Sequence, residues 1–217
     1  MIAIIDYGMG NLRSVQKALE KVGAQTLITQ NSADIKRAEK IVLPGVGAMQ
    51  PAMQKLQELK LIDAIKEAIS QGKPFLGICL GLQLLFEKSF EGGDVPGLGI
   101  FSGTVERFSC TRGTSIKVPH MGWNQIKIKN PRAALFSAVH DAGNFYFCHS
   151  YFVNPKDPTV IVATTGYGIE FASAVWRENV FGVQFHPEKS QSLGLEVLRN
   201  FSEYKQTAKI NPRSVSL

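Results

Sequence analysis

One cysteine of this sequence stands in a setting that suits a nucleophile. The segment Gly77-Ile78-Cys79-Leu80-Gly81 follows an apolar run and precedes a helical pattern. Its spacing is that of a tight strand-to-helix turn around a nucleophile, with cysteine in place of serine. Such a turn exposes the sulfur above a sheet, at a helix N-terminus whose positive end favours the thiolate. The backbone N–H of Leu80 is then free to stabilise an oxyanion.

The competing interpretation of Cys79 is a buried structural cysteine, because free cysteines are common in protein cores. The chain has two others, Cys110 in a polar stretch and Cys148 within an aromatic run, and neither stands in a comparable turn. We expect both to be chemically inert. An odd number of cysteines without a CxxC pair also argues against a disulfide framework and against a zinc site.

A base for that cysteine is available in the segment His186-Pro187-Glu188. Proline pushes the preceding residue into extended geometry, and residues two apart in an extended segment point the same way. The Glu188 carboxylate can therefore hold one nitrogen of the His186 ring protonated, while the other nitrogen acts as the base. Only this histidine has an acid two residues further on, so a structural role is the more ordinary expectation for the rest. The remaining histidines are His120, His140 and His149.

The elements that must position these residues alternate between strand and helix in the first half of the chain. Short apolar runs predict strands over residues 2–5, 25–29, 41–43 and 75–78. Helical spacing predicts helices over residues 12–22, 48–70 and 80–86, the second broken near Leu61. Asn11 can cap the first helix and Gly23 can end it, while Gly72 can end the second. This order favours a parallel sheet with helices on both faces.

The second half of the chain has more strands and ends in a helix. Strands are predicted over residues 103–108, 125–129, 145–153, 160–164, 172–177 and 180–185, and a final helix over 193–204. Glu178-Asn179 is the expected hairpin tip between the last two strands. We therefore predict one α/β domain over residues 1–204, an open doubly wound (flavodoxin-like), mainly parallel sheet with an antiparallel addition. A polar C-terminal extension over 205–217 follows. Active sites of such sheets lie beyond the carboxyl ends of the strands.

The composition excludes several classes of protein. The net charge of +6 comes from 24 basic and 18 acidic residues that are scattered along the chain, so we expect no nucleic-acid partner. No apolar run approaches the ~18 residues of a membrane span, and the N-terminus lacks the basic region of a signal peptide. We therefore expect a cytoplasmic protein. Gly8-Met9-Gly10 is followed by Arg13 where a dinucleotide fingerprint needs a third glycine, which argues against a nucleotide site.

The cysteine turn and the His-Pro-Glu segment together resemble the class I, or triad, glutamine amidotransferases in residue type, order and rough spacing. Further segments resemble one branch of this family, the glutaminase subunits of imidazole glycerol phosphate synthases in histidine biosynthesis. The matching segments reach to about residue 204 and lie at 5–15, 43–47, 119–124, 149–151 and 182–190. The segments 5–15 and 119–124, the latter reading Pro-His-Met-Gly-Trp-Asn, separate this branch from its relatives.

The resemblance implies a role for each matched position. Cys79 would be the nucleophile, His186 the general base and acid, and Glu188 the residue that orients the histidine. Backbone N–H groups of Leu80 and of Val46, the latter once its peptide turns, would stabilise the oxyanion. The residues that would hold glutamine are Gly47, Gln83, Ser150 and Tyr151. The partner would be a (β/α)8-barrel synthase subunit in a heterodimer, and the residues toward it would be His120, Trp123, Tyr146 and Lys189. No metal or organic cofactor is implied.

Two of these segments also have plainer interpretations. The glycines of 43–47 suit a flexible turn that exposes N–H groups, or simply a tight loop. Trp123, in a predicted loop, is either an interface anchor or a lid over the sheet edge. Two other functions stay open: a glutaminase serving a different amidotransferase or acting alone on γ-glutamyl compounds, and a binding subunit that has lost catalysis. The identity of the partner distinguishes the first alternative from the function that the resemblance implies. Labelling of Cys79 by a glutamine-like electrophile distinguishes the second.

Overall fold

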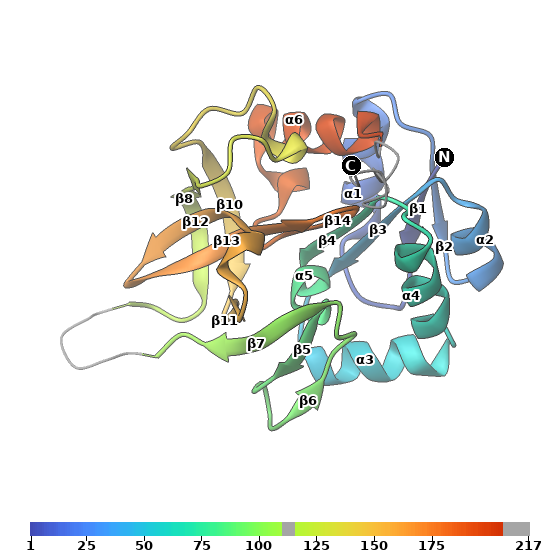
Figure 1. The fold of residues 1–217 in the computed structure, drawn as a ribbon, viewed down its shortest axis with the longest axis horizontal. Coiled ribbons are helices and arrows are strands. Elements are labelled where there is room, and N and C mark those ends of the chain that lie inside the picture. The colour runs from blue at the N-terminus through green and yellow to red at the C-terminus, as the bar shows by residue number, and fades with distance from the viewer. Residues whose placement is uncertain (110–115, 206–217) are drawn as a thin grey trace, which may run out of the picture.

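A parallel sheet forms the centre of the fold. The computed structural model describes residues 1–109 and 116–205. Five strands of the described chain make up this sheet: β1 (Ile2–Ile5), β2 (Thr26–Thr29), β3 (Lys40–Gly45), β4 (Phe75–Cys79) and β14 (Val180–Val183). They run parallel in the order β2-β1-β3-β4-β14 (Figure 1). β1, β4 and β14 are buried along their whole length, as expected for strands that are covered on both faces.

Helices cover both faces of this sheet, and each face has its own apolar core (Figure 1). The larger helices are α1 (Leu12–Lys21), α2 (Ser32–Arg37), α3 (Met49–Glu58), α4 (Ile62–Ser70) and α6 (Gln191–Glu203). On one face α1 and α6 bury Leu19 and Phe201 in a shared cluster. On the other, α3 and α4 bury Leu56 and Ile65, and α2 packs on the same side. The doubly wound arrangement predicted from the alternating elements is confirmed.

The ends of these helices follow local rules. Asn11 accepts a hydrogen bond from the backbone N–H of Ser14 at 3.3 Å and caps α1, as predicted. Gly23, with φ of 89°, lies just beyond the end of the same helix, and Gly72, with φ of 84°, lies just beyond α4. The chain turns between α3 and α4 at Lys60, whose φ is 55°. The break expected near Leu61 is therefore present.

A largely antiparallel extension continues the sheet beyond β14. Its strands are β13 (Ile169–Arg177), β11 (Tyr151–Pro155), β7 (Phe101–Arg107), β5 (Phe86–Ser89) and β6 (Val95–Pro96), while β12 (Ile161–Tyr167) also pairs with β13, and β9 (Lys127–Ile128) pairs with β12. The hairpin between β13 and β14 turns at Glu178, which has φ of 53°. The side chain of Asn179 holds this turn by donating to the carbonyl oxygens of Ile69 and Lys73 at 2.9 and 2.8 Å. The predicted antiparallel addition is thus confirmed.

A second, two-stranded sheet consists of β8 (His120–Gln125) and β10 (Asn144–His149). Only Ser150 separates the end of β10 from the start of β11 in the main sheet. The prediction of one strand over residues 145–153 is therefore wrong. The apolar run continues across Ser150, so the pattern of side chains does not reveal that the strand changes partners there.

Several shorter elements also differ from the prediction. The main strand near residue 125 is His120–Gln125 rather than 125–129, so Trp123 lies in a strand and not in a loop. The helix after Cys79 is α5 (Leu80–Leu84), which ends before 86 because Phe86 starts β5. β3 continues through Pro44-Gly45, two residues beyond the end predicted at residue 43. The sequence did not predict α2, β5 or β6, because such short elements contain too few residues to establish a period.

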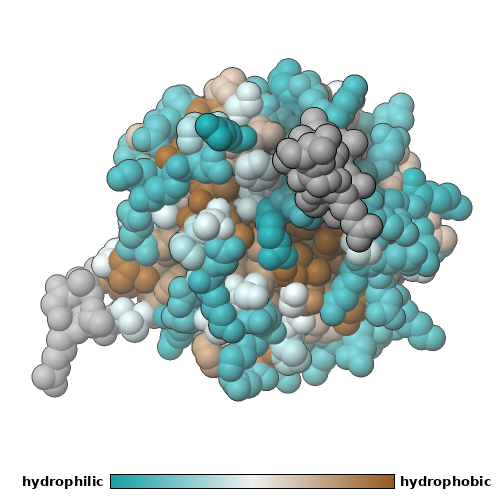
Figure 2. Space-filling model, viewed as in Figure 1, coloured by the Kyte–Doolittle hydropathy of each residue, from teal (hydrophilic) through white to brown (hydrophobic). Residues whose placement is uncertain are grey.

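The surface seen in Figure 2 is mostly hydrophilic, and hydrophobic atoms show mainly in recessed areas between hydrophilic side chains. No helix of the described chain is long and apolar enough to cross a membrane. The single domain over 1–204 stays a prediction. The extension predicted over 205–217 lies outside the described residues except for Lys205.

Candidate active site

The backbone of Cys79 is held in a strained conformation. Cys79 lies between β4 and α5 with φ of 54° and ψ of −107°. A positive φ is uncommon for a residue that carries a side chain. Such strain persists only where the surrounding structure imposes it, and it is concentrated at functional residues. The tight strand-to-helix turn predicted from the glycine spacing is present.

Two glycines permit this turn through close backbone contact. A Cβ on Gly81 would lie 1.8 Å from the carbonyl oxygen of Leu43 in β3. A Cβ on Gly77 would lie 2.6 Å from the carbonyl oxygen of Gly81. The strands β3 and β4 and the helix α5 therefore approach one another more closely than any side chain allows. This packing fixes where the sulfur of Cys79 is presented.

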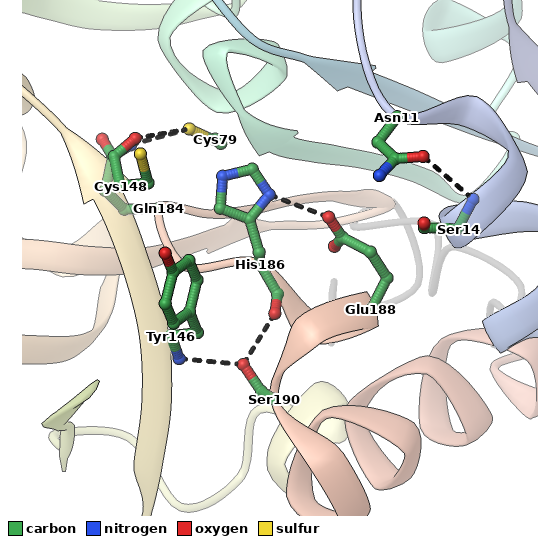
Figure 3. Close-up of polar contacts among 9 residues, drawn as sticks. All are labelled: Asn11, Ser14, Cys79, Tyr146, Cys148, Gln184, His186, Glu188 and Ser190. Carbon is green, nitrogen blue, oxygen red and sulfur yellow. Dashed lines mark hydrogen bonds and ion pairs between the residues drawn. The ribbon is translucent and has the colours of Figure 1, made fainter. Parts of the chain in front are cut away.

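His186 and Glu188 form a buried pair directly after β14. Nδ1 of His186 lies 2.9 Å from Oε1 of Glu188, and the two side chains are only 4% and 2% exposed. His186 is extended, with φ of −100° and ψ of 96°, and Pro187 begins a short 3-10 helix (Pro187–Lys189). Figure 3 shows the second ring nitrogen turned toward Cys79. The pair thus has the geometry that the His-Pro-Glu spacing predicted.

Ser190 fixes the backbone of His186 from behind. Its hydroxyl donates to the carbonyl oxygen of His186 at 2.6 Å and accepts from the backbone N–H of Tyr146 at 3.0 Å (Figure 3). The backbone N–H of His186 in turn donates to the carbonyl oxygen of Tyr146 at 2.9 Å. Ser190 is fully buried, and sequence reasoning did not single it out.

The surroundings of His186 favour its protonated, positively charged ring. Burial lowers the pKa of His186, but hydrogen bonds to Cys79 and Glu188, together with the charges of those two groups, raise it to about 10. A cation beside a cysteine favours the thiolate, which is the nucleophilic form. The electrostatics of the site therefore suit a cysteine nucleophile.

A buried glutamine that the sequence analysis missed contacts the sulfur. Nε2 of Gln184 donates to Sγ of Cys79 at 3.7 Å, and Oε1 of Gln184 accepts from Nε2 of Gln83 at 3.2 Å. Gln83 also donates to the carbonyl oxygen of Tyr151 at 2.9 Å. On its other side the sulfur lies 3.8 Å from the carbonyl oxygen of Cys148. The available signal for Gln184 was a polar residue within a strand that is otherwise apolar.

A cavity of about 240 Å³ opens beside Cys79 and His186. The lining includes Val46, Gly47, Leu80, Gln83, Ser150, Tyr151 and Lys189. Every residue expected to hold the oxyanion or glutamine therefore lies at one cavity, although these residues come from distant parts of the chain. Glu188 does not line it and contacts the far side of the His186 ring.

The four residues expected toward a partner do not share one environment. Trp123 is 49% exposed, and its ring meets that of Tyr146 edge-on at 6.1 Å. Nζ of Lys189 lies 5.7 Å from the centre of the Tyr146 ring. His120, in contrast, is only 3% exposed, so it can affect a partner only through its neighbours. Met121, which is 61% exposed, was not predicted for this surface.

The arrangement could carry out cysteine-dependent acyl transfer, because it brings together a cysteine, a histidine that can act as its base and a carboxylate that can orient the histidine. Within residues 1–109 and 116–205, no three His, Cys, Asp or Glu side chains gather as metal ligands would.

Comparison with known proteins identifies the family. Residues 3–203 match the family model for glutamine amidotransferase class-I. The chain belongs to this family. The match includes both the cysteine turn and the His-Pro-Glu segment of the amidotransferase, so the resemblance seen in the sequence is confirmed.

Similar proteins cover nearly all of this amidotransferase chain. It is 51% identical over 204 residues to "Imidazole glycerol phosphate synthase subunit HisH" of Geobacter metallireducens, covering 93% of this chain and 97% of that protein. A protein of the same name from Thermosynechococcus vestitus is 54% identical over 201 residues, covering 92% and 95%. A crystal structure described as a glutamine amidotransferase superposes with a TM-score of 0.71 at 16% identity, over 93% of this chain and 99% of that one. At that identity the superposition shows the fold alone.

The glycine packing beneath Cys79 gives a first prediction. Gly81→Ala places a methyl group on the Leu43 carbonyl oxygen, and we expect it to lower the free energy of unfolding by at least about 2 kcal/mol. Gly166→Ala is the control, because nothing lies within 4 Å of a Cβ at that position in β12. It should change stability by less than about 0.5 kcal/mol. Urea unfolding of both variants measures the difference. Equal stabilities would show that the contact with the Leu43 carbonyl oxygen leaves room for a methyl group at residue 81.

The charge on His186 gives a second prediction. Its folded pKa lies above the ordinary value of about 6.5, so its contribution to stability is full below that pH and is lost as the pH rises toward 10. Histidine ring NMR should therefore show one ring that titrates far above the others, and Glu188→Gln should lower its midpoint. A His186 midpoint near 6.5 in the native protein would contradict the assignment of charge.

Proposed function

We propose that this chain hydrolyses glutamine to glutamate and ammonia, as the glutaminase subunit of an imidazole glycerol phosphate synthase in histidine biosynthesis. The observation that carries the proposal is the strained Cys79 at the same cavity as His186, whose ring is fixed by Glu188 at 2.9 Å. The relatives that share about half of its residues over nearly full length carry that subunit name. Cysteine, histidine and glutamate form the catalytic triad.

The reaction is an acyl transfer in two stages. The Cys79 thiolate attacks the carboxamide carbon of the glutamine side chain and forms a tetrahedral oxyanion. His186 gives its proton to the departing nitrogen, ammonia leaves, and a γ-glutamyl thioester remains on the sulfur. Water then attacks the thioester, His186 accepts a proton from that water, and glutamate is released.

Backbone N–H groups stabilise the oxyanion in this proposal. One belongs to Leu80, directly after the nucleophile, and the other to Val46, once its peptide turns toward the cavity. A single donor of this kind lowers the barrier by roughly 3 kcal/mol. The glutamine itself is held by Gly47, Gln83, Ser150 and Tyr151, which line the same cavity.

The ammonia is consumed by a partner in this proposal. The partner is a (β/α)8-barrel synthase subunit that forms a cytoplasmic heterodimer with this chain and completes a lyase reaction. It uses ammonia to make imidazole glycerol phosphate and an aminoimidazole carboxamide ribonucleotide. Exposed Met121 and Trp123, with the nearby Tyr146 and Lys189, form the surface that we assign to this contact. Large apolar and aromatic side chains are common anchors of protein interfaces.

The nucleophile gives a third prediction. Cys79→Ala should abolish release of glutamate from glutamine while leaving the melting temperature nearly unchanged, because the substitution removes only the sulfur. Cys148→Ser is the matched control and should keep most of the activity, since Cys148 contacts the nucleophile through its backbone carbonyl. Glutamate release is measured in the presence of the barrel subunit. Release by Cys79→Ala at the native rate would mean that the triad is wrongly assigned.

Coupling between the subunits gives a fourth prediction. A free-running glutaminase would waste glutamine, so we expect the isolated chain to be slow and the barrel subunit with its ribonucleotide to stimulate it at least about a hundredfold. Turning the Val46 peptide from ~1% to ~99% occupancy needs about 5.5 kcal/mol of differential binding, which one protein interface can supply. Glutamate release with and without the partner measures the effect. Equal rates in the two conditions would contradict the coupling.

Delivery of ammonia is tested separately. Added ammonium salt should let the barrel subunit turn over without this chain, because in this proposal only ammonia is delivered. A barrel subunit that still needs this chain at high ammonia would contradict that proposal. If the synthase subunit of a different amidotransferase stimulated glutamine hydrolysis instead, this chain would be assigned as the glutaminase of that other enzyme.

A further inference from the structure

Two buried histidines outside the proposed triad face each other across the small sheet. His120 of β8 and His149 of β10 are paired in the strand register. Nδ1 of His120 lies 3.0 Å from Nε2 of His149, and the two residues are only 3% and 6% exposed. The reaction proposed above gives neither histidine a role. Their hydrogen bonds nevertheless reach the residues that surround the sulfur.

The direction of every hydrogen bond in this pair is determined. Nδ1 of His149 lies 2.7 Å from the carbonyl oxygen of Tyr151, which can only accept, so this nitrogen carries a proton. In a neutral ring Nε2 of His149 is then an acceptor, and Nδ1 of His120 must donate to it. Nε2 of His120 is left as an acceptor for the side-chain N–H of Asn124 at 3.2 Å. Each neutral ring thus has one permitted tautomer.

The surroundings keep both rings neutral. His120 stacks on Tyr167 with ring centres 4.0 Å apart and on Phe147 at 4.8 Å. Burial lowers the pKa of His120 to about 4, and burial is also the largest cause that lowers the pKa of His149, to about 3. A proton added to Nε2 of His149 would face the N–H of His120 Nδ1 across 3.0 Å, and a proton added to Nε2 of His120 would face the Asn124 side-chain N–H across 3.2 Å. At neutral pH the pair therefore has one charge state and one arrangement of protons.

One end of the chain of hydrogen bonds lies at the glutamine cavity. The Tyr151 carbonyl oxygen accepts from His149 and from Nε2 of Gln83. Gln83 continues to Gln184, and Gln184 continues to the Cys79 sulfur. Because the carbonyl is held from both sides, its position sets the orientation of the Gln83 amide.

The other end is anchored in the exposed part of the small sheet. The Asn124 side chain donates to the carbonyl oxygen of Gly166 at 3.0 Å as well as to His120, and its oxygen accepts from the backbone N–H of Gln125 at 2.8 Å. All polar atoms of that side chain are therefore engaged. The histidine pair joins a fixed point in β8 to the residues around the nucleophile.

We propose that His120 and His149 are positioning residues for glutamine: through the Tyr151 carbonyl they hold Gln83 in the orientation that receives the substrate. This inference rests on the proposed glutaminase activity. Neither histidine takes part in bond making or breaking. Their loss should therefore weaken glutamine binding, with less effect on the rate of the bound complex.

Two amide substitutions of His149 separate positioning from mere core filling. In His149→Asn the side-chain N–H group can occupy the place of Nδ1, so the bond to Tyr151 is kept and the link to His120 is lost. In His149→Gln the amide oxygen can occupy the place of Nε2, so the link to His120 is kept and the bond to Tyr151 is lost. Both replace the ring by the same polar group. If His149 only filled space, the shorter asparagine would have at least as large an effect as glutamine.

The measurement is the KM and kcat of glutamine hydrolysis by the complex with the barrel subunit, together with the melting temperature of each variant. We expect His149→Gln to raise KM roughly fivefold or more, with kcat changed less, since one hydrogen bond at the site is lost. His149→Asn should raise KM clearly less, although it removes more of the buried side chain than His149→Gln does. The control His140→Asn replaces an exposed histidine outside this chain of hydrogen bonds, and KM should stay at the native value.

Equal KM changes in the Asn and Gln variants, or a native KM in both with only a lowered melting temperature, would overturn the positioning role. If both variants fail to fold, ring 15N NMR of the native protein locates the proton of His149. A proton on Nε2 would overturn the assigned hydrogen bonds, and a proton on Nδ1 would support them. Native protein that releases no glutamate in the complex would instead refute the proposed function. The two failures are therefore distinguishable.

Discussion

The contact between Gly81 and the Leu43 carbonyl is the constraint on which the rest of this site depends. It brings α5 so close to β3 that no side chain fits between them, and Cys79 is forced to φ of 54° where β4 ends. The strain is supported by β4, which is buried over its full length, and by β3, which is buried from Ile41 to Gly45, so the cost is spread over the core. A sulfur presented in this way faces the carboxyl edge of the sheet, where β14 delivers His186.

Burial lowers the pKa of all three histidines of this site, but their neighbours give them different charge states. His186 is buried beside Cys79 and Glu188, whose hydrogen bonds and charges outweigh the loss of water and keep the ring protonated. His120 and His149 are buried among aromatic rings and one another, without an acid in contact, and they stay neutral. Residue type alone therefore does not set the charge. The neighbours that remain after water is excluded decide which histidine can exchange a proton at neutral pH.

The sequence predicted those features that depend on local pattern. The buried strand at residues 2–5, the cap at Asn11 and the His186–Glu188 pair each follow from spacing within a few residues, and the structure contains all of them. Features that depend on distant partners were missed. Gln184 is one polar residue in the apolar run predicted as a strand over 180–185. It lies just beyond the end of β14, and its contact with Cys79 exists only because β4 and β14 are neighbours. The burial of His120 likewise follows from the rings that β10 and β12 place around it.

The strand change at Ser150 shows why such features gather at one place. A residue that leaves one sheet and enters another has backbone groups that no ladder satisfies, and buried groups of this kind need other partners. Here the Cys148 carbonyl oxygen lies 3.8 Å from the Cys79 sulfur, and the Tyr151 carbonyl oxygen accepts from His149 and Gln83. The Ser150 carbonyl oxygen accepts from the backbone N–H of Phe108 at 3.1 Å. The crossing between sheets therefore supplies the acceptors around the cavity. An uninterrupted strand over 145–153 would have used those carbonyl groups in its own hydrogen-bond ladder and left the side chains around the sulfur without them.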